Sequence, residues 1–264
     1  MGAVRKTALA HNSNFGGQRP VSAIKYIVLH YTANDGDSDE ANAKYFQAPN
    51  RHASAHYFVD DDSITRSVLD NYIAWSVGGS KYTDCGSTGG GKLYGVVTNA
   101  NSISIEMCDT KRDGKYQATE KTMANAAELC KELMKKYNID ASHVVRHFDV
   151  NGKHCPVYFM DDTAWEKFKN RLHKYTFEEG ARYIATQAGY LRTSAGTGKN
   201  TVKFKDLSDA VRKKSRNKFG AAVFKKGQTF RLKKVQYIGE DAWGKMKSGY
   251  WVPLAYKGKV RVKQ

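Results

Sequence analysis

The sequence predicts two domains: an α/β domain in which helices flank a β-sheet, followed by a small, mostly β domain. Apolar runs of strand length alternate with helical patterns up to about residue 175, as in a sheet covered by helices. Beyond residue 176 short strands and glycine turns replace that alternation. The charge shifts at the same place. Residues 1–175 hold 22 Lys and Arg against 20 Asp and Glu, or +2, whereas residues 176–264 hold 21 against 6, or +15 of the total +17.

The strands of the first domain are predicted from short apolar or alternating segments. A turn sequence, Asp60-Asp61-Asp62-Ser63, separates two of them and predicts a hairpin. In the segment that begins at Ser102, alternation places Glu106 on the polar face of an otherwise apolar strand. A lone carboxylate at such a position requires an explanation. The predicted strands are Ile24–His30, Ala55–Val59, Ile64–Leu69, Ser102–Cys108 and Val144–Val145.

Three helices are predicted between and after these strands. Thr119–Tyr137 has the clearest pattern, because its apolar residues recur at helical spacing along one face. Asp39–Gln47 is a shorter helix, and Thr163–Tyr175 closes the domain with Trp165 and Phe168 directed inward. Strands and helices in this order favour an α/β layer.

The second domain is predicted to be a small β-barrel. Its segments are short and closely spaced, and Asp206–Lys218 is the one stretch for which we expect a helix. Aromatic residues alternate with lysines here, and we expect about half of the rings to pack in the core. These aromatic residues are Tyr190, Trp243, Tyr250, Trp251 and Tyr256.

The positive charge of residues 176–264 favours a polyanionic partner: nucleic acid, an anionic membrane or an acidic cell-wall polymer. A merely solvated basic surface is the alternative. Aromatic rings stack on sugars as well as on bases, so composition does not separate a wall glycopolymer from nucleic acid.

Composition and segment lengths exclude several classes of protein. With 41% hydrophobic and 26% charged residues, the chain is neither disordered nor fibrous. No apolar stretch approaches the roughly 18 residues of a membrane helix, so no membrane insertion is expected. Four widely spaced cysteines in a chain this long indicate reduced thiols. The first residues lack the apolar core of a signal peptide, so we expect synthesis in the cytoplasm without one.

His30, His147 and Cys155 form the candidate metal site. His30 closes the first strand, His147 follows Val144–Val145 after one residue, and Cys155 comes eight residues later. Two imidazoles and a thiolate suit tetrahedral zinc, and three protein ligands leave a fourth position open, as in catalytic sites. Alternatives remain from the residues alone. Either histidine could be structural, the cysteine could be a small buried hydrophobe, or His143 and His147 could pair on a helix.

Four ordered segments resemble the signature segments of the zinc-dependent N-acetylmuramoyl-L-alanine amidases. That family includes phage endolysins, bacterial autolysins and the peptidoglycan recognition proteins. The resemblance spans residues 22–175. The segments are YIVLHYTA at residues 26–33, SAHYFVD at 54–60, NSISIEM at 101–107, and RHFDV at 146–150 followed by KHCP at 153–156.

The resemblance implies a fold and a site. The fold is an α/β amidase domain with a central mixed β-sheet flanked by helices, over residues 1–175. Zn2+ would be held by His30, His147 and Cys155. Glu106 matches the family glutamate that faces the metal and would be the catalytic base, and Lys153 would stabilise the oxyanion. The implied activity is hydrolysis of the amide between N-acetylmuramic acid and L-alanine in bacterial peptidoglycan.

Residues 176–264, linker included, resemble a bacterial SH3-like cell-wall-binding domain on GYLR at 189–192, FKKG at 224–227 and WGK at 243–245. This resemblance implies an anionic wall polymer as partner, and no nucleic acid is expected. The expected lack of a signal peptide favours a phage lysin, released to act on the cell wall, over an exported autolysin.

Two departures from the family pattern and two competing functions remain. Ala55 stands where some members carry a catalytic tyrosine, which favours Glu106 as base. Ser76 stands where the family often has histidine, which leaves a substrate contact in question. The competing functions are a non-catalytic peptidoglycan-binding protein and a nucleic-acid-binding protein acting through residues 176–264.

Overall fold

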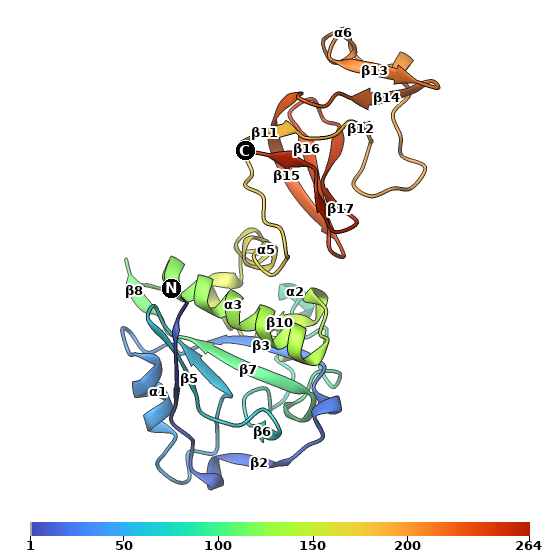
Figure 1. Ribbon diagram of the computed structural model, residues 1–264. Helices are drawn as coiled ribbons and strands as arrows, with labels where there is room; N and C mark the ends of the chain where they lie inside the picture. Colours follow the sequence, from blue (N-terminus) through green and yellow to red (C-terminus); the bar gives the residue numbers. More distant parts are fainter. Residues whose placement is uncertain (1) are drawn as a thin grey trace. The chain divides into compact units, whose positions relative to one another are not determined.

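The computed structural model describes residues 2–264, which divide into two compact units (Figure 1). The first unit ends at Leu172 and the second runs from His173 to Gln264. This division lies close to the boundary expected between residues 175 and 176.

A six-stranded mixed sheet forms the centre of the first unit, in the order β1-β5-β4-β7-β3-β10. Its neighbours pair in parallel except β4 and β5, which form the predicted hairpin with Tyr57 opposite Arg66. The Asp60 carboxylate closes that hairpin by accepting hydrogen bonds from the backbone amides of Asp62 and Ser63. The strands are β1 (Val4–Thr7), β3 (Tyr26–Tyr31), β4 (Tyr57–Val59), β5 (Ser63–Arg66), β7 (Ser102–Met107) and β10 (Val144–Arg146).

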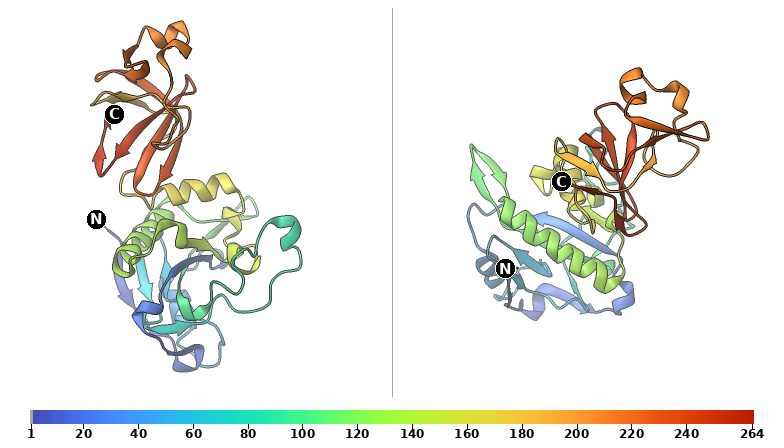
Figure 2. Two further views of the ribbon diagram at one scale, coloured as in Figure 1. Left: turned by 90° about the vertical axis from the view of Figure 1, so that its right-hand side faces the viewer. Right: turned by 45° about the horizontal axis from the view of Figure 1, so that its top comes forward.

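Helices cover both faces of this sheet. Helix α3 (Glu120–Tyr137) lies across one face of the sheet (Figure 2). Its Leu129 and Leu133 belong to one buried cluster with Leu29 and Ile105, and burial of such a side chain stabilises the fold by roughly 1.5–3 kcal/mol. The other face meets α1 (Asp39–Tyr45), whose Asp39 carboxylate accepts hydrogen bonds from hydroxyls of β5. Alternation along each strand therefore separates the groups facing α3 from those on the opposite face.

Shorter elements complete the first unit. Strand pairs β2–β6 and β8–β9 lie outside the main sheet, and α5 ends at Asn170 rather than at the expected Tyr175. The elements are η1 (Asn12–Asn14), β2 (Phe15–Gln18), η2 (Val21–Ala23), β6 (Tyr72–Ala74), α2 (Cys85–Thr88), η3 (Asn99–Asn101), β8 (Thr110–Arg112), β9 (Lys115–Gln117), η4 (Ala141–His143), α4 (His147–Asn151), η5 (Val157–Phe159) and α5 (Asp162–Asn170).

The chain enters the second unit shortly after the end of α5. Within that unit the His173 ring stacks on Tyr237 at 3.8 Å between centroids, and the Tyr237 hydroxyl donates to the Tyr175 carbonyl oxygen. The residues from His173 to Tyr175 therefore belong to the second unit and not to α5.

The second unit is mostly β, as predicted. One sheet has the order β18-β17-β16-β15-β11-β19, a smaller one the order β12-β14-β13, and their apolar faces share a single core. The elements are β11 (Arg182–Ala185), β12 (Gly189–Tyr190), η6 (Phe204–Asp206), α6 (Asp209–Arg212), β13 (Ser215–Lys218), β14 (Ala221–Phe224), β15 (Thr229–Ile238), β16 (Asp241–Met246), β17 (Trp251–Tyr256), β18 (Lys259–Val260) and β19 (Val262–Lys263).

The helix expected over Asp206–Lys218 is confirmed only at Asp209–Arg212. Only the short α6 forms there, and Ser215–Lys218 is strand β13. The cause is pairing with β14, whose Ala222 and Phe224 are buried in the core. Strand pairing outweighs the local helical tendency of these residues.

The structure also shows the state of the cysteines and the apolar character of the helices. All four cysteines are free thiols, as expected. Within residues 2–264, no helix combines the length and the apolar character needed to cross a bilayer.

Candidate metal centre and active site

His30 and Glu106 come from adjacent strands at the same level of the sheet. Residue 30 of β3 pairs with residue 106 of β7, so both side chains project from the same face. Their neighbours Leu29 and Ile105 face α3, so this pair lies on the face away from that helix. His30 Nδ1 is 3.9 Å from Glu106 Oε1, and His30 is 2% exposed.

His147 and Cys155 are brought to the same place by α4 and the loop after it. Helix α4 begins at His147, and Arg146 before it is held by Asp149 and by the Phe159 carbonyl oxygen. The Phe148 amide donates to the Cys155 carbonyl oxygen, which brings the loop back against the helix.

The turn between α4 and Cys155 requires glycine at position 152. Gly152 has φ +94°, and a Cβ there would lie 2.2 Å from the Cys85 sulfur. Only glycine adopts this backbone without cost and leaves room for that approach.

The three candidate ligands converge. One ligand atom from each of His30, His147 and Cys155 lies within 4.8 Å of the others, and all three residues are buried. Cys155 Sγ is 3.8 Å from His30 Nδ1, and the two imidazole centroids are 4.7 Å apart. Residues 125 positions apart in the chain thus form a compact cluster of nitrogen and sulfur donors.

Several polar atoms in this cluster are buried without a protein partner. Among residues 2–264, no hydrogen-bond partner is found for His30 Nε2, for either ring nitrogen of His147, or for Glu106 Oε2. Buried polar groups are ordinarily satisfied, so a concentration of unsatisfied ones indicates a ligand position. Two histidines and one cysteine are also the donor set that zinc prefers, so the residues fit that metal.

Burial shifts the protonation of these groups. It lowers the pKa of His147 to about 4 and that of His30 well below its usual range, so both imidazoles are neutral and able to bind a metal. Burial raises the pKa of the Cys155 thiol, which a bound cation would deprotonate. It also raises the pKa of Glu106 to about 8, against an opposing effect of the Lys153 charge.

Lys153 is exposed, and its charge acts on the whole cluster. Its ammonium lowers the pKa values of His30 and His147 after the larger effect of burial. The Lys153 amide donates to Asn151 Oδ1, which fixes the backbone two residues before Cys155. All five residues singled out in the sequence therefore belong to one region of the first unit.

The alternative pair of His143 and His147 on one helix is wrong. Strand β10 separates them, and the His143 ring packs on Tyr26 with centroids 4.7 Å apart. His56 has a structural role, because its Nδ1 accepts the Ser104 amide and its Nε2 lies 3.0 Å from an Arg19 nitrogen. Ser76 makes a hydroxyl–hydroxyl contact with Ser104, two residues before Glu106 on the same strand face.

Tyr158 was not singled out in the sequence. Its buried hydroxyl has no hydrogen-bond partner within residues 2–264, and burial together with nearby Asp109, Cys155 and Glu106 raises its pKa. Its ring meets Tyr31 edge to face at 6.0 Å. A tyrosine in an aromatic stretch after Cys-Pro carries no sequence signal that separates it from a core residue.

Comparison with known proteins identifies the family. The family model described as N-acetylmuramoyl-L-alanine amidase matches residues 19–158, more than half of the chain. The chain belongs to this amidase family. The match contains every residue of the candidate site.

Individual members of the amidase family are moderately similar. A probable N-acetylmuramoyl-L-alanine amidase of Bacillus licheniformis is 30% identical over 211 residues, covering 77% of this chain and 55% of that protein. The amidase CwlH of Bacillus subtilis (strain 168) is 35% identical over 152 residues, covering 57% of this chain and 53% of that protein. The chain thus spans about half the length of these relatives.

Solved structures support the fold of the first unit. The catalytic domain of XlyA, an amidase of Bacillus subtilis (strain 168), matches with a TM-score of 0.51 at 29% identity, covering 64% of this chain and 99% of that one. The PlyG catalytic domain matches with a TM-score of 0.51 at 25% identity, covering 64% and 93%. The amidase fold expected from the sequence, with its mixed sheet and flanking helices, is confirmed.

Proposed function

We propose that the protein is a zinc-dependent N-acetylmuramoyl-L-alanine amidase that hydrolyses the amide between N-acetylmuramic acid and L-alanine in bacterial peptidoglycan. The observation that carries this proposal is the convergence of His30, His147 and Cys155 beside the Glu106 carboxylate. The family membership supports it. The protein would act on the cell wall, as an endolysin does.

The proposed chemistry divides between the metal and two side chains. Zn2+, when bound, supplies Lewis acidity that polarises a carbonyl and acidifies water. A cation bound beside Glu106 would lower its raised pKa and favour the carboxylate. That carboxylate has an oxygen without a protein partner, so it can accept a proton from the attacking water and pass it to the departing alanine nitrogen. Lys153 supplies positive charge where the carbonyl oxygen becomes negative.

For the second unit, we propose an SH3-like wall-binding domain with an anionic wall polymer as its ligand. Trp243 and Trp251 are buried, which leaves Tyr190 among the exposed rings. Phe219 was missed in the sequence analysis. It is 97% exposed between β13 and β14, with φ 52°, and Arg216 and Lys218 precede it closely in the sequence.

Exposure of a large apolar ring is unfavourable, and so is a left-handed backbone conformation at a residue other than glycine. A role in binding would explain why both occur at Phe219. An exposed ring in a strongly basic unit suits a polymer that carries both sugars and anionic groups. Attachment to the wall would raise the local concentration of the amidase at its substrate.

Zinc content and the identity of the cleaved bond test this function. The purified chain is expected to hold about one zinc ion, removable by a chelator. Digestion of purified walls should release new alanine amino termini, with intact N-acetylmuramic acid identified by mass spectrometry. A chain that binds walls without releasing amino termini would be a peptidoglycan-binding protein instead. DNA affinity with a steep salt dependence and no wall binding would favour the nucleic-acid alternative.

A further inference from the structure

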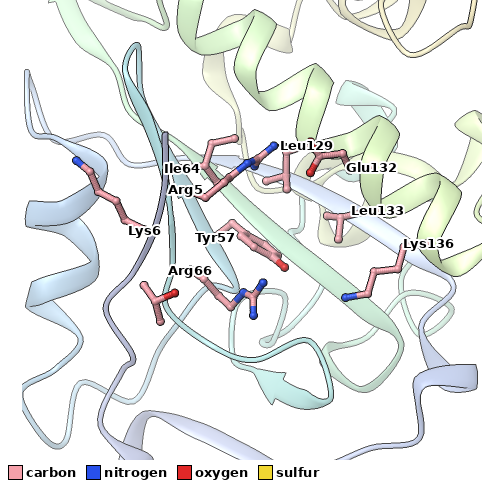
Figure 3. Close-up of a pocket in the computed structure, with 10 residues that line it drawn as sticks. Arg5, Lys6, Tyr57, Ile64, Arg66, Leu129, Glu132, Leu133 and Lys136 are labelled. Carbon is pink, nitrogen blue, oxygen red and sulfur yellow. Dashed lines mark hydrogen bonds and ion pairs between the residues drawn. The ribbon is translucent and has the colours of Figure 1, made fainter. Parts of the chain in front are cut away.

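A pocket of about 250 Å3 lies on the first unit beside α3, outside the metal cluster (Figure 3). It is bounded by the edge strand β1 and its neighbour β5, and Tyr57 of β4 and Leu133 of α3 also line it. Ile64 of β5 adds a further apolar surface. The pocket forms because α3 packs mainly on β4 and β7 and leaves the edge of the sheet open beside it.

Four cationic side chains line this pocket against one carboxylate, Glu132. Three of the cations have ion-pair partners. Arg5 pairs with Glu132 at 2.5 Å, Lys6 with Glu40 at 2.9 Å and Lys136 with Asp70 at 2.8 Å.

Arg66 is the exception. It forms no ion pair with any residue from 2 to 264, and its Nε is buried without a hydrogen-bond acceptor. Its guanidinium carbon is 5.8 Å from the centroid of the Tyr57 ring. Both residues line the pocket, where the guanidinium and the ring lie close together (Figure 3). A buried N–H without an acceptor costs free energy of desolvation, so this donor indicates a position for a ligand that accepts a hydrogen bond.

We propose that the pocket is a binding site for an anionic group, a carboxylate or a phosphate, held by Arg66 above the apolar surface of Tyr57 and Ile64. The planar guanidinium presents paired donors that match either group. The Lys136 ammonium uses one of its three donors on Asp70, so it can offer another to the same ligand.

This site is separate from the proposed amidase centre. Tyr57 and Ile64 belong to the core cluster that packs with α3, on the same face of the sheet as Leu29 and Ile105. His30 and Glu106 project from the opposite face. The pocket would therefore bind its ligand independently of the metal, as a second contact of the catalytic unit with an anionic molecule.

Titration of the whole chain with two small probes tests the proposal and separates the sources of the anion. Inorganic phosphate represents a phosphate-bearing polymer, and N-acetylalanine represents a peptide carboxylate. Binding is followed by calorimetry and by amide NMR shifts in β1, β5 and α3, with ionic strength held constant. Saturable binding of either probe with shifts confined to those elements is the expected result, and the tighter probe identifies the source.

Variants of Arg66 decide whether the guanidinium holds the ligand. Arg66→Gln should weaken binding about tenfold or more, as expected for loss of a charged hydrogen bond. Arg66→Lys keeps the charge and the stem but loses the paired donors, so its affinity should be intermediate; it also serves if the Gln variant does not fold. Lys121→Gln removes an exposed charge of the same unit and should leave binding unchanged.

Two outcomes would overturn the site. One is the lack of saturable binding of both probes to the unmodified chain. The other is equal affinity of the unmodified chain and a folded Arg66 variant, which would mean that the ligand binds elsewhere. Zinc content and wall hydrolysis are measured on the same samples, so failure of this site is distinguishable from failure of the proposed amidase function.

Discussion

In the first unit the polar groups of the candidate metal site are buried, whereas in the second unit the charged groups lie on the surface. His30, His147 and Cys155 are buried around unsatisfied nitrogen atoms. Residues 176–264 instead carry 21 basic against 6 acidic residues, and an ion pair within that unit joins Arg212 to Asp209. Electrostatic interactions of buried groups are strong because the local dielectric is low and solvent does not screen them, whereas exposed charges are screened and share their effect among many residues.

This difference predicts how each unit responds to substitution. In the first unit, a single change in the cluster should lower activity by orders of magnitude, because each buried group has a separate role. In the second, single lysine changes should have small effects on wall binding, and increasing salt should weaken it progressively.

Glu106→Gln should lower kcat by roughly 10²–10⁴, because an amide of the same shape cannot take the proton from water. Zinc content should stay unchanged, since Glu106 is not among the proposed ligands. Amino-terminus release from purified walls measures the rate, and metal analysis of the same sample gives the zinc. Cys155→Ser is the matched comparison and should lose zinc as well as activity. A Glu106→Gln protein with undiminished hydrolysis would remove the proposed base.

Lys153→Met should lower kcat by about 10²-fold with little change in KM, because the lost charge acts mainly on the developing oxyanion. Lys153 is exposed, so the free energy of unfolding should change little. Steady-state kinetics on walls measure the effect. Lys92→Met, which removes another exposed lysine of the same unit, is the control. Equal kinetics for the two variants would assign no catalytic role to Lys153.

Gly244→Ala should destabilise the second unit by about 1–3 kcal/mol through overpacking. A Cβ at this position would lie 2.5 Å from Leu232 Cδ2 and 2.9 Å from Leu254 Cδ2. Gly198→Ala is the control, since its added Cβ would have no atom within 4 Å. Thermal unfolding measures the change, while zinc content should remain the same in both. Loss of zinc from a folded Gly244→Ala protein would contradict a metal site held by the first unit alone.

The sequence predicted the parts of the molecule that depend on regular patterns. The hairpin at Asp60, the strand that carries Glu106 and the long helix α3 follow from turn residues, alternation and helical spacing. The convergence of His30, His147 and Cys155 could be expected only from the resemblance, because nothing in the spacing of three distant residues fixes their distance in space. The structure supplies that distance.

Elements that depend on long-range pairing could not be predicted. Strand β1 is short and polar at Val4–Thr7, and it exists because it pairs with β5, about 60 residues away. Strand β13 was mistaken for part of a helix for the same reason. The pocket at Arg66 depends on both β1 and α3, so it could not be recognised before those elements were placed together.

Phe219→Gly should change stability less than the other variants do. Unlike Gly244→Ala, it should stabilise the second unit. Position 219 has φ 52°, a region where glycine avoids a cost of roughly 1 kcal/mol, and the exposed ring contributes little packing. The unfolding temperature of the second unit should therefore rise slightly, while the amount of protein that sediments with purified walls should fall. Ile238→Ala, at another exposed apolar residue of the unit, should leave wall binding unchanged. If Phe219→Gly binds walls as well as the unmodified chain does, the exposed ring is not a wall contact, and the distributed lysines alone account for attachment.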